Sequence, residues 1–284
     1  MIAFFKKVAR RLRLLLTGEA PKKEDRFEIA ARLAMEIKAA LGAPLVYLDI
    51  GSGGSTDWNW QVMIERGLLN VVQVDFASEW SKGQLPDRPN ITKVRAALGD
   101  REGSVPVYIT HHPGCSSCLE PDKEVLKSYP SCVWFEVASV DTVDLQRYDV
   151  LQEIQDLPQP QIVKIDVQGY ESQVLAGLGR TLDRVLCLEF ECQLRAIYKG
   201  QRVFSELYDD LRTKGFVLRD LKPQGVFEGE ALEFNSFWAR LPQTPIEERI
   251  IEFWALQNQI WTAPSFEKID TEERSKYHFH EVMR

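Results

Sequence analysis

The fold of this chain is decided by residues 47–55, which read Tyr-Leu-Asp-Ile-Gly-Ser-Gly-Gly-Ser. A short apolar run ends in an acid and then enters a glycine-rich turn, which is typical of a β-strand followed by a ligand-binding loop. Glycines suit such a turn because they adopt positive φ and let a ligand come close to the backbone. In open α/β sheets, ligands bind beyond the carboxyl ends of the strands, where the strand order reverses. The stretch therefore predicts an α/β fold with a ligand site at this turn.

Strand-like and helix-like segments alternate along most of the chain, which predicts βαβ units, a mostly parallel sheet and helices on both of its faces. Two more strands are expected between the third and fourth core strands, at residues 105–110 and 133–140. Core strands are expected at residues 45–50, 71–76, 91–98, 162–167 and 185–191, and helices at 29–41, 57–69, 171–182, 204–214 and 245–261.

The end of the sheet carries a second fold signal. Residues 216–221 and 232–241 read as two consecutive strands joined by a glycine-containing loop. A terminal antiparallel hairpin on an otherwise parallel sheet is a feature of class I methyltransferases, whereas dinucleotide-binding domains usually finish with parallel strands. The sequence therefore predicts the class I methyltransferase fold, a Rossmann-like α/β fold with a seven-stranded sheet.

The composition and net charge of the chain argue against one class of partner and favour one cellular location. Hydrophobic residues make up 44% of the 284 residues and charged residues 27%, which is ordinary for a soluble globular protein. The net charge of -7 and the isoelectric point near 5.3 argue against a nucleic-acid partner, because nucleic-acid binders usually carry a basic surface. Five cysteines at irregular spacing do not form a secreted disulfide framework, so a cytoplasmic location is expected.

The chain divides into three predicted parts. Residues 1–25 hold a basic amphipathic helix, at 1–16, and a linker; residues 26–241 form the methyltransferase domain; residues 242–284 form a last helix and a tail. The first helix has two interpretations: peripheral docking on the anionic inner face of a membrane, or packing on the domain. The last helix could supply a lid or a contact between identical subunits, which would make the protein a homo-oligomer.

A second acid stands at the end of the next predicted strand. Asp75 could accept hydrogen bonds from the two hydroxyls of an adenosine ribose, and its charge disfavours a 2′-phosphate. Thr56 occupies the position where a dinucleotide fingerprint would place its third glycine. The pattern favours an adenosine ligand, and an NAD-dependent oxidoreductase or epimerase remains the alternative enzyme.

Two charged side chains lie within the otherwise apolar strand expected at residues 162–167, and they are candidates for a role in catalysis. Lys164 and Asp166 share one face of that strand, and charges in such a place are unfavourable unless they are paired or functional. Asp166 is the first choice for a catalytic base, with Glu189 as a second candidate and Glu191 on the same face of the next strand. The same carboxylates could instead hold Mg²⁺, since this cation prefers oxygen ligands. A structural Lys–Asp pair is the third interpretation.

The loop at residues 111–118 reads His-His-Pro-Gly-Cys-Ser-Ser-Cys. Its histidines and cysteines are zinc-ligand types, but no second cysteine pair stands at zinc-ribbon spacing, so no metal ligand is assigned. The preferred interpretation is a substrate loop that covers the cofactor, with His111 as a candidate general base.

Several motifs together resemble the FkbM-type methyltransferase family. They occur in the family's order over roughly residues 45–240, and the most specific is Val-Lys-Ile-Asp-Val-Gln-Gly-Tyr-Glu at residues 163–171. The others lie at residues 96–100 with Gly103, at 140–144, at 174–177 and at 188–190.

The resemblance implies an O-methyltransferase that uses S-adenosylmethionine and acts on a hydroxyl of a small molecule or glycan. Loss of activity in a binding module of the same fold is a further alternative. The resemblance also implies roles for individual residues. The methionine part of the cofactor would be held by Asp49, Gly51, Ser52 and Gly53, the ribose by Asp75, and the adenine by Phe76, Ala97 and Leu98.

Overall fold

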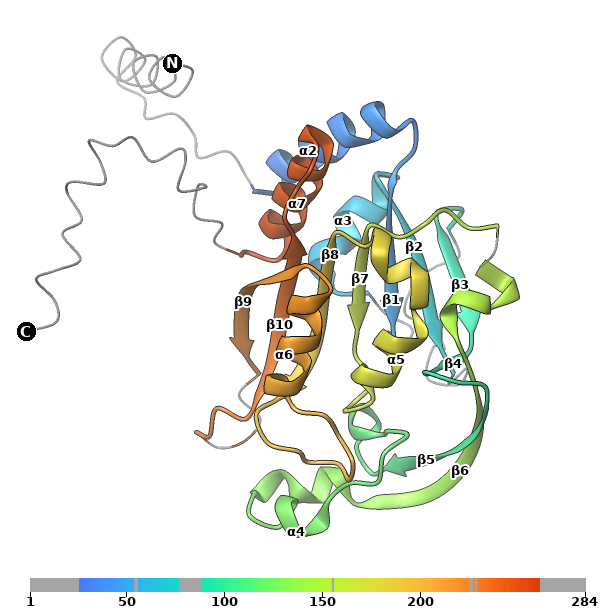
Figure 1. Cartoon of the computed structure of the whole chain (residues 1–284), viewed down its shortest axis with the longest axis vertical. Helices are drawn as coiled ribbons and strands as arrows, with labels where there is room; N and C mark the ends of the chain where they lie inside the picture. Colours follow the sequence, from blue (N-terminus) through green and yellow to red (C-terminus); the bar gives the residue numbers. More distant parts are fainter. Residues whose placement is uncertain are drawn as a thin grey trace, which may run out of the picture.

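Helices cover both faces of a seven-stranded sheet in the computed structural model of this protein (Figure 1). The structure describes residues 26–260, except 54–55, 77–87, 155, 225–226 and 228. The expected helix at residues 1–16 and the tail after residue 260 lie outside the described residues.

The main sheet has the order β3-β2-β1-β7-β8-β10-β9. β1 pairs in parallel with β2 on one side and β7 on the other, so the strand order reverses between β1 and β7. β10 runs antiparallel to both of its neighbours, which confirms the predicted terminal hairpin and fold class. The strands are β1 Leu45–Ile50, β2 Leu69–Asp75, β3 Ile91–Arg95, β7 Ile162–Ile165, β8 Cys187–Gln193, β9 Phe216–Pro223 and β10 Glu233–Arg240.

Alternation of apolar side chains along β1 divides the core into two layers. Leu48 and Ile50 pack on the face that carries α5 and α6, while Leu45 and Tyr47 pack on the opposite face with α2, α3 and α7. Both layers are buried, so β1 is buried along its whole length. Among the described residues, no helix has the length and apolar character needed to cross a membrane. The helices are α2 Arg26–Leu41, α3 Trp58–Glu65, α5 Glu171–Gly177, α6 Phe204–Thr213 and α7 Pro245–Gln257.

A smaller three-stranded sheet lies beyond the carboxyl ends of β1 and β7 (Figure 1). Its order is β4-β6-β5, formed by β4 Ala97–Leu98, β5 Gly103–Thr110 and β6 Val137–Gln146. The short helix α4, Lys123–Leu126, accompanies it, and Leu126, Phe135 and Tyr198 share a separate apolar cluster. This sheet and its loops lie beyond the carboxyl ends of the parallel strands, where a ligand is expected.

Two strand predictions need correction. The strand expected at 91–98 is divided between the two sheets, because β2 ends at Asp75 and Ala97 pairs with Leu145 of β6 instead. The strand expected at 133–140 begins later, at Val137, because Pro130–Phe135 forms a 3-10 helix. This helix buries Phe135 in the separate apolar cluster that it shares with Leu126 and Tyr198. Proline favours the first position of such a turn.

Glycines shorten two predicted helices. The helix expected at 57–69 ends at Glu65, since Gly67 has φ +63° and the chain then enters β2. The helix expected at 171–182 ends at Gly177 and continues as the 3-10 helix Gly179–Arg184, with Gly179 at φ +49°. Positive φ is unfavourable for other residues, and glycine at these points stops the α-helix.

Candidate active site

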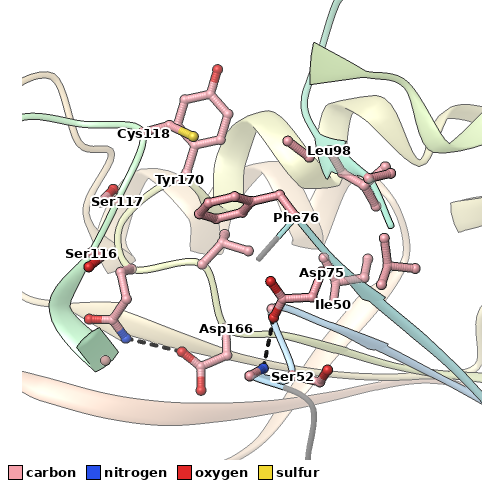
Figure 2. A pocket seen from close by; sticks show the side chains of 18 of the residues that line it. Ile50, Ser52, Asp75, Phe76, Leu98, Ser116, Ser117, Cys118, Asp166 and Tyr170 are labelled. Carbon is pink, nitrogen blue, oxygen red and sulfur yellow. Dashed lines mark hydrogen bonds between the residues drawn. The ribbon is translucent and has the colours of Figure 1, made fainter. Parts of the chain in front are cut away.

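A cavity of about 560 Å³ opens at the carboxyl ends of β1, β2 and β7. Ligand pockets span roughly 300–1,000 Å³, so this volume suits a ligand of cofactor size. Figure 2 shows the carboxylates of Asp75 and Asp166 in this cavity, drawn below the rings of Phe76 and Tyr170. The lining residues are 50–53, 74–76, 96–98, 113–114, 116–118, 166–168 and 170.

The turn after β1 lies directly against the chain that follows β7. Gly51 donates its N–H to the carbonyl of Val74 at 2.9 Å, and its φ is +77°. A Cβ atom on Gly51 would stand 1.9 Å from the carbonyl oxygen of Asp166. Only glycine permits this approach. The glycine turn and the Asp166 segment, recognised separately in the sequence, therefore form two walls of one cavity.

Asp75 fixes the other side of the glycine turn. Its Oδ2 accepts a hydrogen bond from the N–H of Gly53 at 2.8 Å, which ties the loop to the end of β2. A carboxylate offers about four acceptor positions, so one group can hold the loop and still accept bonds from a diol. Phe76, Ala97 and Leu98 add apolar surface to the same cavity. The predicted ribose and adenine residues are thus brought together.

Asp166 lies on the cavity wall and is flanked by one cation. Its carboxylate is 3.8 Å from Nζ of Lys164, which is also 3.3 Å from Asp57. Burial alone would lower the pKa of Lys164, but the surrounding carboxylates, led by Asp49 and Asp166, raise it above its usual value. Lys164 therefore carries a positive charge and cannot itself serve as a base, whereas Asp166 lines the cavity, as Asp75 does on its other side.

Asp49 and Glu189 do not line the cavity. Both share a sheet face with Lys164, which is their register neighbour on β7. Asp49 is fully buried and accepts a hydrogen bond from the hydroxyl of Thr56 at 2.9 Å, and burial raises its pKa to about 6. Glu189 accepts one from the hydroxyl of Tyr47 at 2.6 Å, and burial raises its pKa to about 7. The geometry gives both carboxyls structural contacts beneath the site.

The loop that follows β5 contributes part of the cavity wall, but His111 does not. Gly114, Ser117 and Cys118 line the cavity, whereas His111 is exposed to solvent and outside the lining. The neighbouring His112 places Nδ1 3.8 Å from the Cys115 sulfur. The loop thus forms one side of the cavity, and His111 is not among the residues that line it.

The carboxylates do not form a metal centre. Within the part of the chain that the structure describes, no three or more His, Cys, Asp or Glu side chains gather in a way that could hold a metal ion. Glu189 is directed to Tyr47, and Glu191 accepts a hydrogen bond from Gln168. Mg²⁺, which was the alternative use considered for these carboxylates, therefore finds no fitting ligand set among the described residues.

Tyr170 and Cys118 are cavity residues that sequence reasoning did not select. Tyr170 stands one residue after Gly169, whose φ of +92° turns the chain towards α5. Its place in the motif at 163–171 was a usable signal, because the segments that follow β1 and β2 at the same edge also line the cavity. Cys118 lies in the loop expected to cover the cofactor, but the sequence did not single it out, and its position follows from the pairing of Tyr108 with Ser117 across the loop.

Glu171 holds the turn behind Asp166. Its side chain is buried, with 2% exposed, and its Oε1 accepts hydrogen bonds from the N–H groups of Val167 at 3.2 Å and Gly169 at 3.1 Å. Burial raises the pKa of Glu171 to about 8, the charge of Asp166 adds to the rise, and the backbone hydrogen bonds oppose it. The neutral carboxyl is therefore the favoured form in the folded protein at neutral pH.

This raised pKa predicts a pH-dependent loss of stability that the Glu171→Gln variant lacks. The stabilising contribution of the neutral carboxyl is complete below its ordinary pKa near 4.5 and is lost as the pH rises to about 8. As the pH rises from about 4.5 to about 8, the wild type should therefore lose up to about 1.4 kcal/mol of unfolding free energy per pH unit relative to Glu171→Gln. Urea unfolding at several pH values measures the difference. Parallel curves for the two proteins would contradict the expectation.

The fold and the cavity together define the class of protein. A sheet ordered β3-β2-β1-β7-β8-β10-β9, in which only β10, the last strand that the structure describes, runs antiparallel, with a cavity at the reversal point, is that of a class I methyltransferase of Rossmann-like fold. The chain belongs to the methyltransferase FkbM domain family, whose match covers residues 52–218, more than half of the 284 residues. The family expected from the motifs is thus confirmed.

Solved structures with similar chain arrangements are distant in sequence. A Burkholderia thailandensis 1,6-didemethyltoxoflavin-N1-methyltransferase is 14% identical, with 75% of this chain and 79% of that chain covered and a TM-score of 0.33. Human methyltransferase-like protein 13 is 11% identical, with 85% and 95% covered and a TM-score of 0.35. The Methanococcus jannaschii fibrillarin pre-rRNA processing protein is 14% identical, with 70% and 68% covered and a TM-score of 0.38. No curated protein sequence matches the chain.

Proposed function

We propose that this protein is an S-adenosylmethionine-dependent O-methyltransferase that acts on a hydroxyl of a small molecule or glycan. The observation that carries the proposal is the shared cavity of Asp75 and Asp166, which lie at the ends of two parallel strands and face one ligand-sized space. The family supplies the reaction class, and these two acids supply a binding group and a proton acceptor.

The residues of the cavity fit the proposed cofactor. The backbone of Gly51–Gly53 approaches the space closely, as a charged amino-acid moiety requires, and Asp75 suits a ribose diol. The apolar surface of Phe76, Ala97 and Leu98 suits the adenine ring. When bound, the cofactor would supply an electrophilic methyl group on sulfur.

Asp166 accounts for the choice of a hydroxyl acceptor. A hydroxyl is a poor nucleophile until its proton is accepted, and a carboxylate in hydrogen-bond reach can take that proton during the transfer. Methyl transfer is an in-line displacement, so orientation of the two reactants supplies much of the remaining rate. The loop from Gly114 to Cys118 closes one side of the cavity and would help to orient the acceptor.

The dinucleotide alternative is disfavoured by Thr56. A dinucleotide fingerprint needs a glycine there for close packing of the first helix. Thr56 is instead a buried residue, 2% exposed, whose hydroxyl donates to Asp49 and accepts from the amide of Gln73. These bonds give the threonine a structural role of its own in the turn.

Calorimetric titration with S-adenosylmethionine, S-adenosylhomocysteine and NAD tests the cofactor. The first two should bind, and Asp75→Ala should weaken both about 10- to 100-fold, because a hydrogen bond to a charged group contributes about 1.5–3 kcal/mol. Asp209→Ala, an exposed acid on α6, is the matched control and should bind as the wild type does. Tight binding of NAD without S-adenosylmethionine would make the oxidoreductase interpretation the better one.

The acceptor is tested by following a labelled methyl group. Transfer from methyl-labelled S-adenosylmethionine to a panel of sugars and other hydroxyl compounds should yield a methyl ether, identified by mass spectrometry and by its stability to base. A methylamine or methyl ester as the main product would overturn the assignment of a hydroxyl acceptor.

A further inference from the structure

Gln168 stands in the cavity wall with an unfavourable backbone conformation. Its φ is +54°, a left-handed value that is uncommon for residues other than glycine. In the described residues only Gln259 shares this feature. Such a conformation is unfavourable by roughly 1–2 kcal/mol, and glycine would adopt it without that strain. Strain retained in a site wall directs attention to what the side chain does there.

The side chain of Gln168 joins two acids. Its Nε2 donates to Oδ1 of Asp166 at 3.1 Å and to Oε1 of Glu191 at 3.1 Å. A primary amide has two N–H donors on one nitrogen, which is what a bridge between two carboxyl groups requires. Figure 2 shows the bond that reaches Asp166 on the cavity side. The amide therefore connects an acid of the cavity to an acid buried behind it.

Tyr198 fixes the orientation of that amide. Its hydroxyl, on a residue that is 1% exposed, donates to the carbonyl oxygen of Cys115 at 2.9 Å and lies 3.3 Å from Oε1 of Gln168, so its single proton is shared between the two acceptors. A reversed amide would turn its oxygen towards both carboxyl groups and lose both donor contacts. The same tyrosine reaches the loop that closes the cavity, so the bridge is anchored on the loop side as well.

Glu191, at the buried end of the bridge, is also held by side chains other than Gln168. Gln193 donates to Oε1 of Glu191 at 3.0 Å and to Glu233 at 3.2 Å, and Gln201 donates to Gln193. Burial raises the pKa of Glu191 well above its usual range, and the charge of Asp166 adds to the rise. The bridge thus ends on a buried carboxyl that is itself held by the amide of Gln193.

We propose that Gln168 is a positioning residue for the methyl-transfer reaction, holding the Asp166 carboxylate in the cavity through the amide bridge to Glu191. The inference rests on the proposed function, in which Asp166 accepts the proton of the acceptor hydroxyl. Glutamine is suited to this place because glutamate offers no donor to either acid and asparagine is one methylene shorter.

The environment of Asp166 defines how its titration should respond. One cation and four acid side chains face it from five elements, and burial raises the pKa of each of these acids, so a further carboxylate beside Asp166 would disfavour its charged form. These groups are Lys164 on β7, Asp49 on β1, Glu171 on α5, Glu191 on β8 and Glu233 on β10.

Two substitutions of Gln168 test separately the amide donor and the length of the side chain that carries it. Gln168→Glu keeps the length but replaces the bridging amide with a third acid, so the titration midpoint of Asp166 should move up by about one pH unit or more. Gln168→Asn keeps an amide on a residue that tolerates left-handed backbone. It should move that midpoint up by less than Gln168→Glu does, because only the hydrogen bond to Asp166 is lost, while lowering kcat about 10- to 100-fold, because the carboxylate loses its alignment. Gln259→Glu, an exposed left-handed site, is the charge control.

The titration is read by NMR of protein carrying ¹³C-carboxyl aspartate, with the Asp166 signal assigned by its absence in Asp166→Asn. This measurement needs no acceptor, so it stands apart from any failure to find methyl transfer. An upward shift in Gln168→Glu but not in Gln259→Glu supports the positioning role. Coincident midpoints in Gln168→Glu and the wild type would overturn it, as would a full kcat in Gln168→Asn with an acceptor turned over by the wild type.

Discussion

Replacing Gly51 with alanine is expected to lower the free energy of unfolding by more than about 3 kcal/mol. The added Cβ would stand 1.9 Å from the carbonyl oxygen and 2.8 Å from the carbonyl carbon of Asp166. Those are backbone atoms, which cannot move aside as the end of a flexible side chain can. The left-handed φ of +77° adds a further penalty of roughly 1–2 kcal/mol for any residue with a side chain.

Gly53 provides the matched control, two residues along the same turn. It also has positive φ, +56°, but a Cβ there meets nothing within 4 Å. Gly53→Ala should therefore lose only the roughly 1–2 kcal/mol of conformational strain. Urea unfolding of both variants measures the difference. Equal losses would show that the turn and the Asp166 segment do not approach each other as closely as described.

Replacing Asp166 with asparagine is expected to lower kcat by about 10²–10⁴-fold, the usual contribution of a positioned general base. Asparagine keeps the shape of the side chain and its acceptor oxygen, so the contact with Gln168 can persist. The affinity for S-adenosylmethionine should change little, because Asp75 and the glycine turn hold the cofactor in the proposed arrangement. Steady-state kinetics and calorimetry on the same preparation separate the two effects.

Glu189→Gln is the informative comparison, because Glu189 was the second candidate for the base. The structure places it against Tyr47, away from the cavity wall. We expect its kcat to stay within about threefold of the wild type, since it does not reach the reacting groups. If Glu189→Gln lost activity and Asp166→Asn kept it, the two roles would have to be exchanged.

The fold was predictable because its signals are local and strong. Buried parallel strands read as short apolar runs, and the glycine turn after residues 45–50 marks the ligand edge of such a sheet. The terminal hairpin then separated the methyltransferase arrangement from a dinucleotide-binding one. The predicted strand bounds were wrong where pairing with residues distant in the sequence decides the structure. Ala97 and Leu98 continue an apolar strand in sequence, but they pair with β6 because β2 offers no further partner after Asp75.

The positions of most residues proposed to hold the cofactor were also predictable, since strand ends converge at one edge in any parallel sheet, but that of Asp49 was not, because its carboxyl is buried against Thr56. Gly51, Asp75, Phe76, Ala97 and Leu98 all line the cavity, as their positions at strand ends require. The catalytic side was less so. The sequence ranked Asp166 first but left Glu189 and His111 as candidates, and only their surroundings distinguish the one that lines the cavity from the buried and the exposed one.

By itself, the sequence determined the sheet, the ligand edge and the family, because backbone periodicity and glycine turns are encoded by neighbouring residues. The tertiary structure alone decided which acid faces the cavity and which amide holds it. Gln168, Glu191 and Tyr198 come from three separate segments and meet only after folding. Their hydrogen bonds depend on distances of a few ångströms between those segments, and no spacing along the chain records such distances.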